Sequence, residues 1–546
     1  MYAGRGAQVT IRSASGRLRA ALWRGQRAPA VDPWLDFVSH VEPVLTRQPR
    51  VHRFATPPVI GAESAPATAL AVWIDGAGDA AEQTRAALAA GTMGPAAVLD
   101  GPLREALATT RADRVMLIRA GDRPAPMAVE RLAQAAALAP DAAVISCDRD
   151  RLSPSGRRGS PCFSPGPSPD RWLACDDSGT LIVVSRERAA AVTQTLTGGG
   201  AWRHELALRL AGPAAAAHAH VPLILCHAAP APPTELMSAA AVTELLSGWE
   251  PGTRVEQTSP EVRRVRRQPT REPSVEAIIC FRDRPELLER AAHSVLRRTE
   301  YERLSLALVD NGSRTAETAA LLERLARKGR VRILRDDRPF NFAQLNNAAV
   351  RTSHADVVVF LNNDTEVLDP DWVSTLLEEA LRTEVGAVAP LLSYPNGSVQ
   401  HAGAAIGLHG YAGHPFAGLA PDQPTPFGHA AQGTRNWLAV TAACMMIERA
   451  KFTAVGGFDG TFVVAGNDVD LCLRLTSAGR RSLCVPYATL MHDESQSRGA
   501  HIDPGDFVAS ERSYGAFRSV GDPFYNPNLT LRATDCAVRA PDEELP

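Results

Sequence analysis

Apolar residues in the second half of the chain form short runs at 275–280, 304–309 and 357–361, of which the first two each contain one polar residue. Runs of this length are typical of strands that are buried on both faces. Between them, 285–298 and 342–351 carry apolar residues three and four positions apart, which predicts helices. This alternation predicts an α/β unit with a mainly parallel sheet and right-handed crossovers.

The third run ends abruptly in Asn362, Asn363 and Asp364. A carboxylate that follows such a strand lies at the carboxyl edge of the sheet, where open α/β sheets bind ligands. With amides beside it, this carboxylate can hold a hard divalent cation, and the cation can hold a diphosphate. The alternative is an Asn/Asp turn without chemistry, and the stretch alone favours that alternative.

Further polar residues follow other strands of the same unit. Asp310 ends the strand at 304–309, and His492 follows an apolar stretch. Asp468 and Asp470 open a segment with helical spacing, where the positive helix end favours ionised carboxylates. An ionised carboxylate beside a sugar can take the proton of an attacking hydroxyl. Each residue alone fits a turn, a helix cap or an ion pair with Arg474, but their combined order indicates a site.

The first half of the chain repeats the same pattern with fewer carboxylates. RVMLIRAGD, which ends at Asp122, parallels VVVFLNND, and HVPLILCH, which ends at His227, parallels VPYATLMH. The segment at 202–209 parallels the segment at 466–474. We interpret the chain as a tandem repeat of one domain type, with the first copy stripped of most carboxylates.

Composition shifts predict the boundaries. We expect a basic and partly disordered segment at 1–67, a first domain at 68–249, an exposed linker at 250–273, a second domain at 274–530 and a tail at 531–546. The arginines of the linker are interpreted as a solvated face.

Residues 1–31 hold arginines and no acidic side chain, so a disordered basic tail is the preferred interpretation. The alternative is a short amphipathic stretch, with Leu18, Leu22 and Trp23 on one face, that lies on an anionic membrane.

Composition narrows the class of protein. The 546 residues carry a net charge of −2, which argues against a nucleic-acid partner. Nine scattered cysteines without a C-x-x-C pair indicate reduced thiols in a cytoplasmic protein, not disulfides or a zinc site. We find no apolar run long enough to span a bilayer and no signal-peptide core.

From about 274 to 529 the sequence resembles a bacterial family-2 glycosyltransferase of the GT-A fold. The resemblance extends to the O-antigen and rhamnosyltransferase-type enzymes of surface polysaccharide synthesis. It is carried by IICFRDRPELL (278–288), LVDNGS (308–313), PFNFAQLNNAA (339–349), FLNNDTEV (360–367), GSVQHAGAAIG (397–407), VTAACMMIERAKFTAVGGFDGTF (440–462), GNDVDLCLRLTSAGRR (466–481), HDESQSRG (492–499) and DPFYNPNL (522–529).

The resemblance implies a role for each matched residue. The nucleotide-sugar side would comprise Cys280, Phe281, Arg282, Asp310, Asn311, Asn347, Asn362 and Asn363, with Asn347 beside the diphosphate. Asp364 and His492 would hold Mn²⁺ or Mg²⁺, and Asp468 would be the catalytic base. The acceptor side would comprise Gly457, Phe458, Asp459 and Asp470. The metal motif is ordinarily Asp-x-Asp, and Asn362 replaces its first Asp.

The first unit resembles the same family more faintly. Arg119–Asp122 keeps one carboxylate where the family has several, and His204–Glu205 occupies the expected place of the acidic base pair. The expected fold is therefore two α/β, Rossmann-like GT-A domains in tandem. The first would be a degenerate pseudo-enzyme domain with a structural or acceptor-docking role.

The family resemblance implies an inverting transferase. It would move a hexosyl or deoxyhexosyl group from a UDP-, dTDP- or GDP-linked donor to a glycan or lipid-linked acceptor. The location would be the cytoplasm, with peripheral contact at the inner membrane face left open. The alternatives are a decayed scaffold of a polysaccharide assembly complex and a nucleotidyltransferase, which would leave the GGFD and NDVDLCLR segments unexplained. The loop at 393–435, with His401, His409 and His414, is the expected determinant of specificity.

Overall fold

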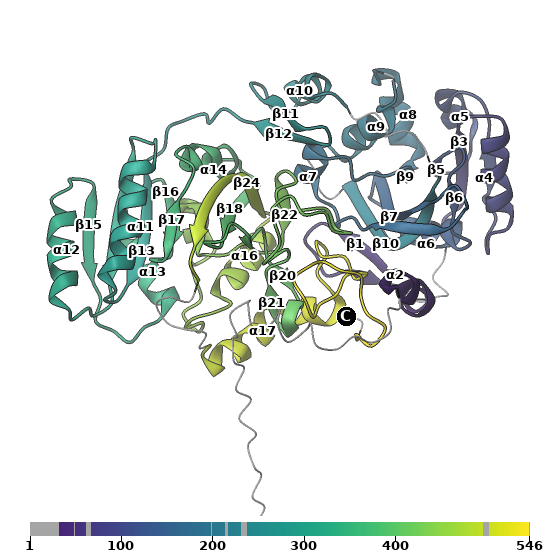
Figure 1. The fold of residues 1–546 in the computed structure, drawn as a ribbon. Helices are drawn as coiled ribbons and strands as arrows, with labels where there is room; N and C mark the ends of the chain where they lie inside the picture. The colour runs from purple at the N-terminus through teal and green to yellow at the C-terminus, as the bar shows by residue number, and fades with distance from the viewer. Residues whose placement is uncertain are drawn as a thin grey trace, which may run out of the picture.

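The computed structural model describes residues 32–47, 50–61, 67–197, 199–212, 217–230, 237–494 and 502–544. The basic stretch 1–31 and residues 495–499 of the HDESQSRG motif lie outside these ranges. Within them, two ten-stranded mixed sheets form two lobes, the first domain in blue and the second in teal to green (Figure 1). No helix of the described ranges is long and apolar enough to cross a membrane.

The first lobe has sheet order β2-β1-β10-β7-β9-β5-β3-β4. Its strands are β1 (Arg50–Arg53), β2 (Val59–Ile60), β3 (Leu70–Asp75), β4 (Ala97–Leu99), β5 (Arg114–Arg119), β6 (Arg123–Pro124), β7 (Val144–Leu152), β8 (Arg158–Cys162), β9 (Leu181–Ser185) and β10 (His218–Ala228). Its helices are α2 (Pro33–Asp36), η2 (Phe37–Val41), α3 (Glu42–Thr46), α4 (Asp79–Ala89), α5 (Leu103–Thr109), α6 (Ala128–Leu138), α7 (Pro169–Ala174), α8 (Arg186–Val192), η3 (Thr193–Thr195), α9 (Trp202–Ala211) and α10 (Ala239–Ser247).

The second lobe has sheet order β15-β14-β13-β16-β23-β18-β24-β17. Its strands are β13 (Val275–Phe281), β14 (Leu304–Asp310), β15 (Val331–Arg335), β16 (Val357–Leu361), β17 (Thr365–Val367), β18 (Val385–Ser393), β19 (Val399–His401), β20 (Ala405–Ile406), β21 (Ala412–Gly413), β22 (Arg435–Trp437), β23 (Cys444–Glu448) and β24 (Arg481–His492). Its helices are α11 (Pro285–Arg298), α12 (Ala316–Ala326), α13 (Phe342–Arg351), α14 (Trp372–Ala380), η5 (Leu408–Gly410), α15 (Arg449–Ala454), α16 (Asn467–Ser477) and α17 (Pro504–Val520).

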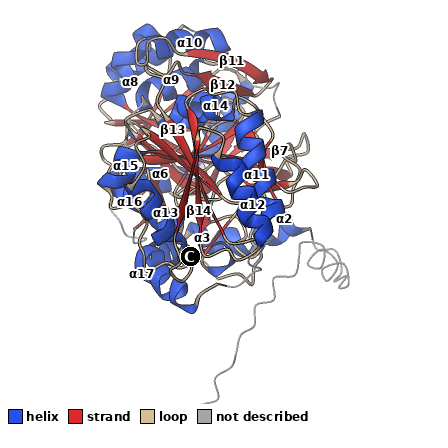
Figure 2. Cartoon of the chain, turned by 90° about the vertical axis from the view of Figure 1, so that its left-hand side faces the viewer, coloured by secondary structure: helices blue, strands red, loops and turns tan. Residues whose placement is uncertain are grey.

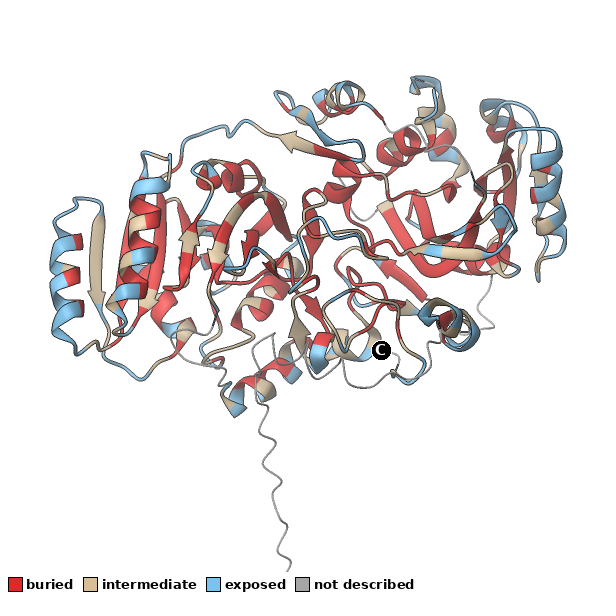
Figure 3. Ribbon diagram, in the orientation of Figure 1, coloured by how far each residue is buried: buried red, intermediate tan, exposed pale blue. Residues whose placement is uncertain are grey.

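Strand β16 shows why these sequences form a covered sheet. Its residues are all buried, and alternate side chains enter two different cores on opposite faces. Val357, Val359 and Leu361 face the core that contains α11, whereas Val358 and Phe360 face the core that contains α13. Helices therefore lie on both sides of the strands (Figure 2), and only the outer faces of helices such as α11 and α12 are exposed (Figure 3).

The two lobes share one topology. The path β4-β3-β5-β9-β7-β10 of the first corresponds to β14-β13-β16-β23-β18-β24 of the second, with the same parallel and antiparallel pairs. The short strands β6 and β17 also occupy matching places, each antiparallel to the last long strand of its lobe. The prediction of two α/β domains in tandem is confirmed.

The N-terminal segment and the tail are more ordered than the sequence indicated. Strand β1 pairs with β10 in the first sheet, and Phe37 is fully buried. In the tail, Cys536 and Arg539 are buried, and Val538 bridges Leu529. These segments enter the fold because their few apolar side chains find partners in distant parts of the chain, which local composition does not reveal.

The expected exposed linker also contains structure. Residues 254–259 and 262–266 form a hairpin of strands β11 (Arg254–Ser259) and β12 (Val262–Arg266). Arg263 is 1% exposed and donates hydrogen bonds to the carbonyls of Leu173 and Met237. Arg267 is paired with Glu379 at 2.7 Å. The interpretation of these arginines as a solvated face is wrong, because carboxylates and carbonyls of both lobes compensate their charge.

Buried polar contacts join the two lobes. Asp170 of the first lobe lies 2.6 Å from a guanidinium nitrogen of Arg382 and 3.0 Å from one of Arg481. Asp148 accepts hydrogen bonds from the side chains of Asn526 and Asn528 at 2.8 and 3.0 Å. Removing one partner of such a buried pair strongly destabilises a protein. These contacts therefore hold the two lobes together as one unit.

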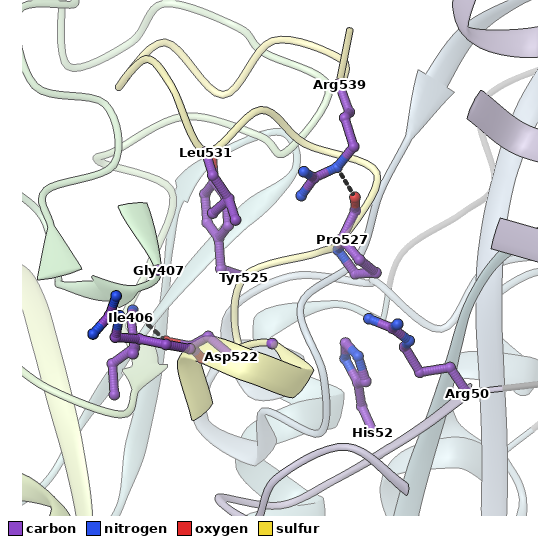
Figure 4. Close-up of a pocket in the computed structure, with 11 residues that line it drawn as sticks. Arg50, His52, Ile406, Gly407, Asp522, Tyr525, Pro527, Leu531 and Arg539 are labelled. Atoms are coloured by element: carbon purple, nitrogen blue, oxygen red, sulfur yellow. Dashed lines mark hydrogen bonds between the residues drawn. The ribbon is translucent and has the colours of Figure 1, made fainter. Parts of the chain in front are cut away.

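The C-terminal segment, in yellow in Figure 1, closes over the junction. Asp522, Arg50, His52 and Arg539 line a cavity of about 10 Å³ there (Figure 4), which is room for about one water molecule. Oδ2 of Asp522 accepts the N–H of Ile406 at 2.9 Å. Burial raises the pKa of Asp522 to about 7.

Candidate active site

The nucleotide side of the site forms where β13, β14 and β15 end together. The strand register places Asp310 beside both Phe281 and Arg335. Asp310 is 4% exposed, accepts the N–H of Ser313 at 2.8 Å and is paired with the guanidinium of Arg335. Cys280 lies one position earlier on β13, so the predicted nucleotide-side residues of these two strands are brought together. Arg335 was missed, because a single arginine at a strand end carries no distinctive pattern.

The loop after β13 is held in a strained conformation. Asp283 and Arg284 have φ values of 51° and 54°, which non-glycine residues rarely adopt. The carboxylate of Asp283 accepts the N–H groups of Arg314 and Thr315 at 2.8 and 3.1 Å. The hydrogen bond from Arg314 lowers the pKa of Asp283. The loops that follow β13 and β14 are thereby held together beside the exposed Arg282. The sequence alone did not indicate this role of Asp283.

Asn311 serves the fold of these loops. Its side-chain amide donates to the carbonyls of Asp336 and Arg338, both at 2.8 Å. The resemblance implied a nucleotide contact for Asn311. The structure instead gives both of its side-chain donors to the loop that follows β15.

The candidate cation site lies where β16 ends. Oδ1 of Asp364 is 3.2 Å from Nε2 of His492, and Nδ2 of Asn362 is 3.4 Å from the same nitrogen. Register explains the approach, because Thr365 of β17 pairs with His492 of β24. The buried Asn363 completes the turn between them.

Two buried atoms of this cluster make no hydrogen bond within the described residues. They are Nδ1 of His492 and Oδ1 of Asp364, which has only the 3.2 Å contact with His492. A carboxylate oxygen is a ligand that Mn²⁺ and Mg²⁺ prefer, and neutral imidazole is a common metal ligand. These residues therefore fit a divalent cation. The described residues contain no group of three His, Cys, Asp or Glu side chains that could hold a metal, so further ligands would come from Asn362 or from a bound diphosphate.

The candidate base, Asp468, is half-buried at the second residue of α16. Its Oδ2 accepts the N–H of Ala442 at 3.1 Å, and its Oδ1 accepts the N–H of Val469 at 2.9 Å. Two N–H donors at the start of the helix hold this carboxylate in place.

One short loop, 441–443, connects three parts of the site. The N–H of Thr441 donates to Nε2 of His401 at 3.4 Å, and the next N–H, of Ala442, donates to Asp468. The carbonyl of Ala443 accepts the N–H of Asn362 at 2.9 Å. The base, the cation cluster and His401 are thus held by consecutive residues. His401 was named only as part of a specificity loop, and this contact was not visible in its spacing.

The turn at 456–459 forms one wall of the site. Gly457 has a φ of 71°, and a Cβ there would lie 2.6 Å from Oδ1 of Asn347. Asn347 accepts the N–H of Phe458 at 3.0 Å and donates to its carbonyl at 2.8 Å. Both polar groups of Asn347 therefore hold this turn, and its contact with a diphosphate stays a prediction. Asp459 lies 3.1 Å from the exposed Arg512.

Helix α17 holds the base-bearing helix in place. Asp470 bonds Arg474 at 2.7 Å and accepts from Ser513 of α17 at 2.7 Å. Asp470 therefore joins the two helices, and its place on the acceptor side stays a prediction. Asp506 of α17 is 1% exposed and accepts three backbone N–H groups, those of residues 463, 464 and 465, at 2.6, 3.0 and 2.9 Å. Asp506 fixes the loop that leads to Asp468 and was missed, although its place just after Asp503-Pro504 marks a helix start.

The first lobe carries different chemistry at the matching positions. Asp122 follows β5 as Asp364 follows β16, but Oδ1 of Asp122 accepts from the guanidinium of Arg119 at 2.6 Å and from the N–H of Ala229 at 2.9 Å. The positively charged side chain of Arg119 therefore lies where the second lobe has the candidate cation ligands Asp364 and His492.

The position of the base is also changed in the first lobe. The pair Glu205–Arg209 on α9 corresponds to Asp470–Arg474 on α16. Two positions before Glu205 stands Arg203, which donates to Asp75 at 3.0 Å. By this register Glu205 keeps one carboxylate of the predicted acidic pair, and Arg203 corresponds to Asp468.

Parts of the chain are similar to known proteins. Residues 276–446 match the model of glycosyl transferase family 2. The chain is 39% identical over 456 residues to the O-antigen biosynthesis protein RfbC of Myxococcus xanthus, covering 81% of the chain and 36% of that protein. It is 30% identical over 247 residues to N-acetylglucosaminyl-diphospho-decaprenol L-rhamnosyltransferase of Mycobacterium tuberculosis, covering 41% of the chain and 76% of that protein.

The extent of these matches differs between relatives. A further match, protein y4gI of Sinorhizobium fredii, is 40% identical over 277 residues, covering 49% of the chain and 30% of that protein. The chain therefore spans about a third of the length of this relative and of RfbC. Among solved structures, the mannosyltransferase PcManGT of Pyrobaculum calidifontis, in complex with GDP-Man and Mn²⁺, matches with a TM-score of 0.34 and 17% identity over 46% of this chain and 69% of that one.

Proposed function

The chain belongs to glycosyl transferase family 2, and from that premise we propose that its second domain, about 274–530, transfers a sugar from a nucleotide-sugar donor to a glycan or lipid-linked acceptor. The names of two relatives support surface polysaccharide synthesis as the setting, since one acts in O-antigen biosynthesis and one is a rhamnosyltransferase with a lipid diphosphate acceptor. A similar acceptor would bring this enzyme to the cytoplasmic face of the membrane.

One observation carries the proposal. The buried Oδ1 of Asp364 lacks a hydrogen-bond partner among the described residues, beside His492 and at a sheet edge built for ligands. The loop at 441–443 connects this cluster to Asp468, a carboxylate at a helix N-terminus. A pair of cation ligands and a positioned base are the parts that a single-displacement transferase requires.

The mechanism follows from these parts. Asp310 and the loops held by Asp283 would bind the nucleoside. A divalent cation held by Asp364 and His492, with the Asn362 amide nearby, would neutralise charge on the departing nucleoside diphosphate. Asp468 would accept the proton of the acceptor hydroxyl as its oxygen attacks the anomeric carbon from the opposite face. The bond from that carbon to the diphosphate breaks in the same step, which inverts the configuration.

We propose a non-catalytic role for the first domain, about 68–249. Arg119 neutralises Asp122, and Arg203 stands in the place of the base. The buried contacts between the two domains support a structural role, in which the first domain holds the acceptor side of the second domain in place. The alternative for the whole chain is a decayed scaffold, and Asn362 in place of an Asp is the observation that favours it.

A thermal-shift screen separates the two functions. The full chain is heated with UDP-, dTDP- and GDP-linked sugars, each with and without Mn²⁺ or Mg²⁺, alongside the variant Asp364→Asn. Ligand binding raises the melting temperature by mass action. We expect a rise that needs one nucleotide class together with a cation and that is lost in the variant. A folded wild-type sample that shows no rise with any combination would favour the scaffold.

A further inference from the structure

Two histidines in the loop at 393–435 form a hydrogen-bonded pair that the mechanism above does not use. Nδ1 of His401 lies 2.9 Å from Nδ1 of His414, and the rings meet edge to face with centroids 4.8 Å apart. His401 is fully buried, whereas His414 is half-buried. Only one of these rings can therefore reach a substrate.

A hydrogen bond from the backbone indicates which ring nitrogen of His401 carries the proton. A peptide N–H is always a donor, so Nε2 of His401, which receives the N–H of Thr441 at 3.4 Å, is unprotonated. Burial holds the pKa of His401 well below its usual range, so the ring is neutral and carries its proton on Nδ1. That proton is donated to His414.

The same reasoning assigns the tautomer of His414. Nδ1 of His414 accepts from His401 and therefore has no proton to donate to the carbonyl of Gly403, which lies 3.4 Å away. A neutral His414 must then carry its proton on Nε2. Within the described residues, Nε2 of the half-buried His414 makes no hydrogen bond, so this N–H can donate to a ligand.

The pair lies beside the acceptor side of the proposed site. Thr441, which orients His401, directly precedes Ala442, which holds Asp468. Tyr411, three residues before His414, packs against Phe507 of α17, the helix that fixes the loop leading to Asp468. We propose that His414 is a specificity residue that donates its Nε2–H to a hydroxyl of the acceptor sugar, with His401 setting its tautomer. This inference rests on the proposed glycosyl transfer.

Tautomers are read directly from long-range ¹H–¹⁵N spectra of the full chain labelled with [¹⁵N]histidine, with signals assigned from His401→Gln and His414→Gln. We expect an Nδ1–H form for His401 and an Nε2–H form for His414. Titration with a short-chain N-acetylglucosaminyl diphosphate lipid should move the Nε2 signal of His414. An Nδ1–H form of His414, or a signal that stays unmoved at saturating probe, would overturn the proposal. Neither readout depends on turnover. Failure of this inference can therefore be distinguished from failure of the proposed glycosyl transfer.

Kinetics with the same acceptor probe provide the second test. His414→Ala should raise the acceptor KM about tenfold, the worth of one hydrogen bond, with kcat and the melting temperature little changed. His414→Gln, which can place an N–H near the same position, should recover part of the loss. His354→Asn, in an exposed histidine outside this loop, is the control and should leave KM unchanged. A purely structural His414 would instead lower the melting temperature without a selective rise in KM.

Discussion

The guanidinium of Arg119 donates to Oδ1 of Asp122 at 2.6 Å, at the end of the strand that corresponds to the one before Asp364. The first lobe thus holds its own positive charge, whereas Oδ1 of Asp364 in the second lobe makes no hydrogen bond within the described residues. This difference supports the proposal that the first domain is structural and the second catalytic.

The substitutions Asp122→Asn and Asp364→Asn should have different effects on stability and on donor binding. Asp122→Asn removes a charged partner of Arg119 and should lower the free energy of unfolding by about 2 kcal/mol, without changing cation-dependent donor binding. Asp364→Asn should abolish that binding with little loss of stability. Isothermal titration with Mn²⁺ and a nucleotide sugar, beside denaturant unfolding, measures both. Cation binding that depended on Asp122 would contradict the assignment of the first lobe.

Asn362→Asp should strengthen the cation site. A second carboxylate beside Asp364 and His492 adds negative charge at hydrogen-bonding distance from the imidazole, and carboxylates bind hard cations more tightly than amides. We expect the half-saturating Mn²⁺ concentration for donor binding to fall several-fold. Asn363→Asp, in the next residue, is the control. An unchanged Mn²⁺ requirement in Asn362→Asp would place the cation elsewhere.

Asp506 should affect activity from a distance. Its carboxylate accepts the N–H groups of residues 463–465, and Asp506→Ala would leave these donors without partners. We expect a loss of about 2–3 kcal/mol in stability and a lower kcat with a nearly unchanged donor affinity, because the loop before Asp468 loosens. Asp503→Ala removes only the cap of α17 and should cost about 1 kcal/mol. Equal kcat values in the two variants would argue against a role in positioning.

Asp522 should make stability depend on pH. Burial raises its pKa from 3.8 to about 7, against backbone N–H groups that favour the charge. Since the folded chain keeps this proton while the unfolded chain releases it, stability should fall as pH rises from about 4 to about 7, by up to about 1.4 kcal/mol per pH unit. Asp522→Asn should flatten this slope in urea titrations. A slope that survives the substitution would mean that other groups cause it.

The sequence predicted most of the fold because the central strands of the second lobe are mainly apolar and short. Strand β16 is buried throughout, and helices α11 and α13 begin and end at the residues that the spacing predicted. Asp310, Asp364 and His492 were recognisable because polar residues that end apolar strands stand out.

Other parts depend on contacts between distant segments. The arginines near residue 263 look solvated in sequence, yet Arg263 is buried by carbonyls 90 and 26 positions away. Asn347 and Asp470 carry the expected residue types, but their partners, Phe458 and Ser513, are decided by tertiary packing. The pairing of His401 with His414 likewise depends on how the loop at 393–435 folds back.

Turnover and donor binding of Asp468→Asn test the central claim most directly, with Asp470→Asn as the matched control. Asn is nearly isosteric with Asp but cannot accept the proton of an acceptor hydroxyl. We predict that Asp468→Asn loses at least a hundredfold in kcat, the usual worth of a general base, while donor and cation raise its melting temperature as in the wild type. Asp470→Asn should lose stability and keep most of its kcat. Full turnover in Asp468→Asn would contradict the account.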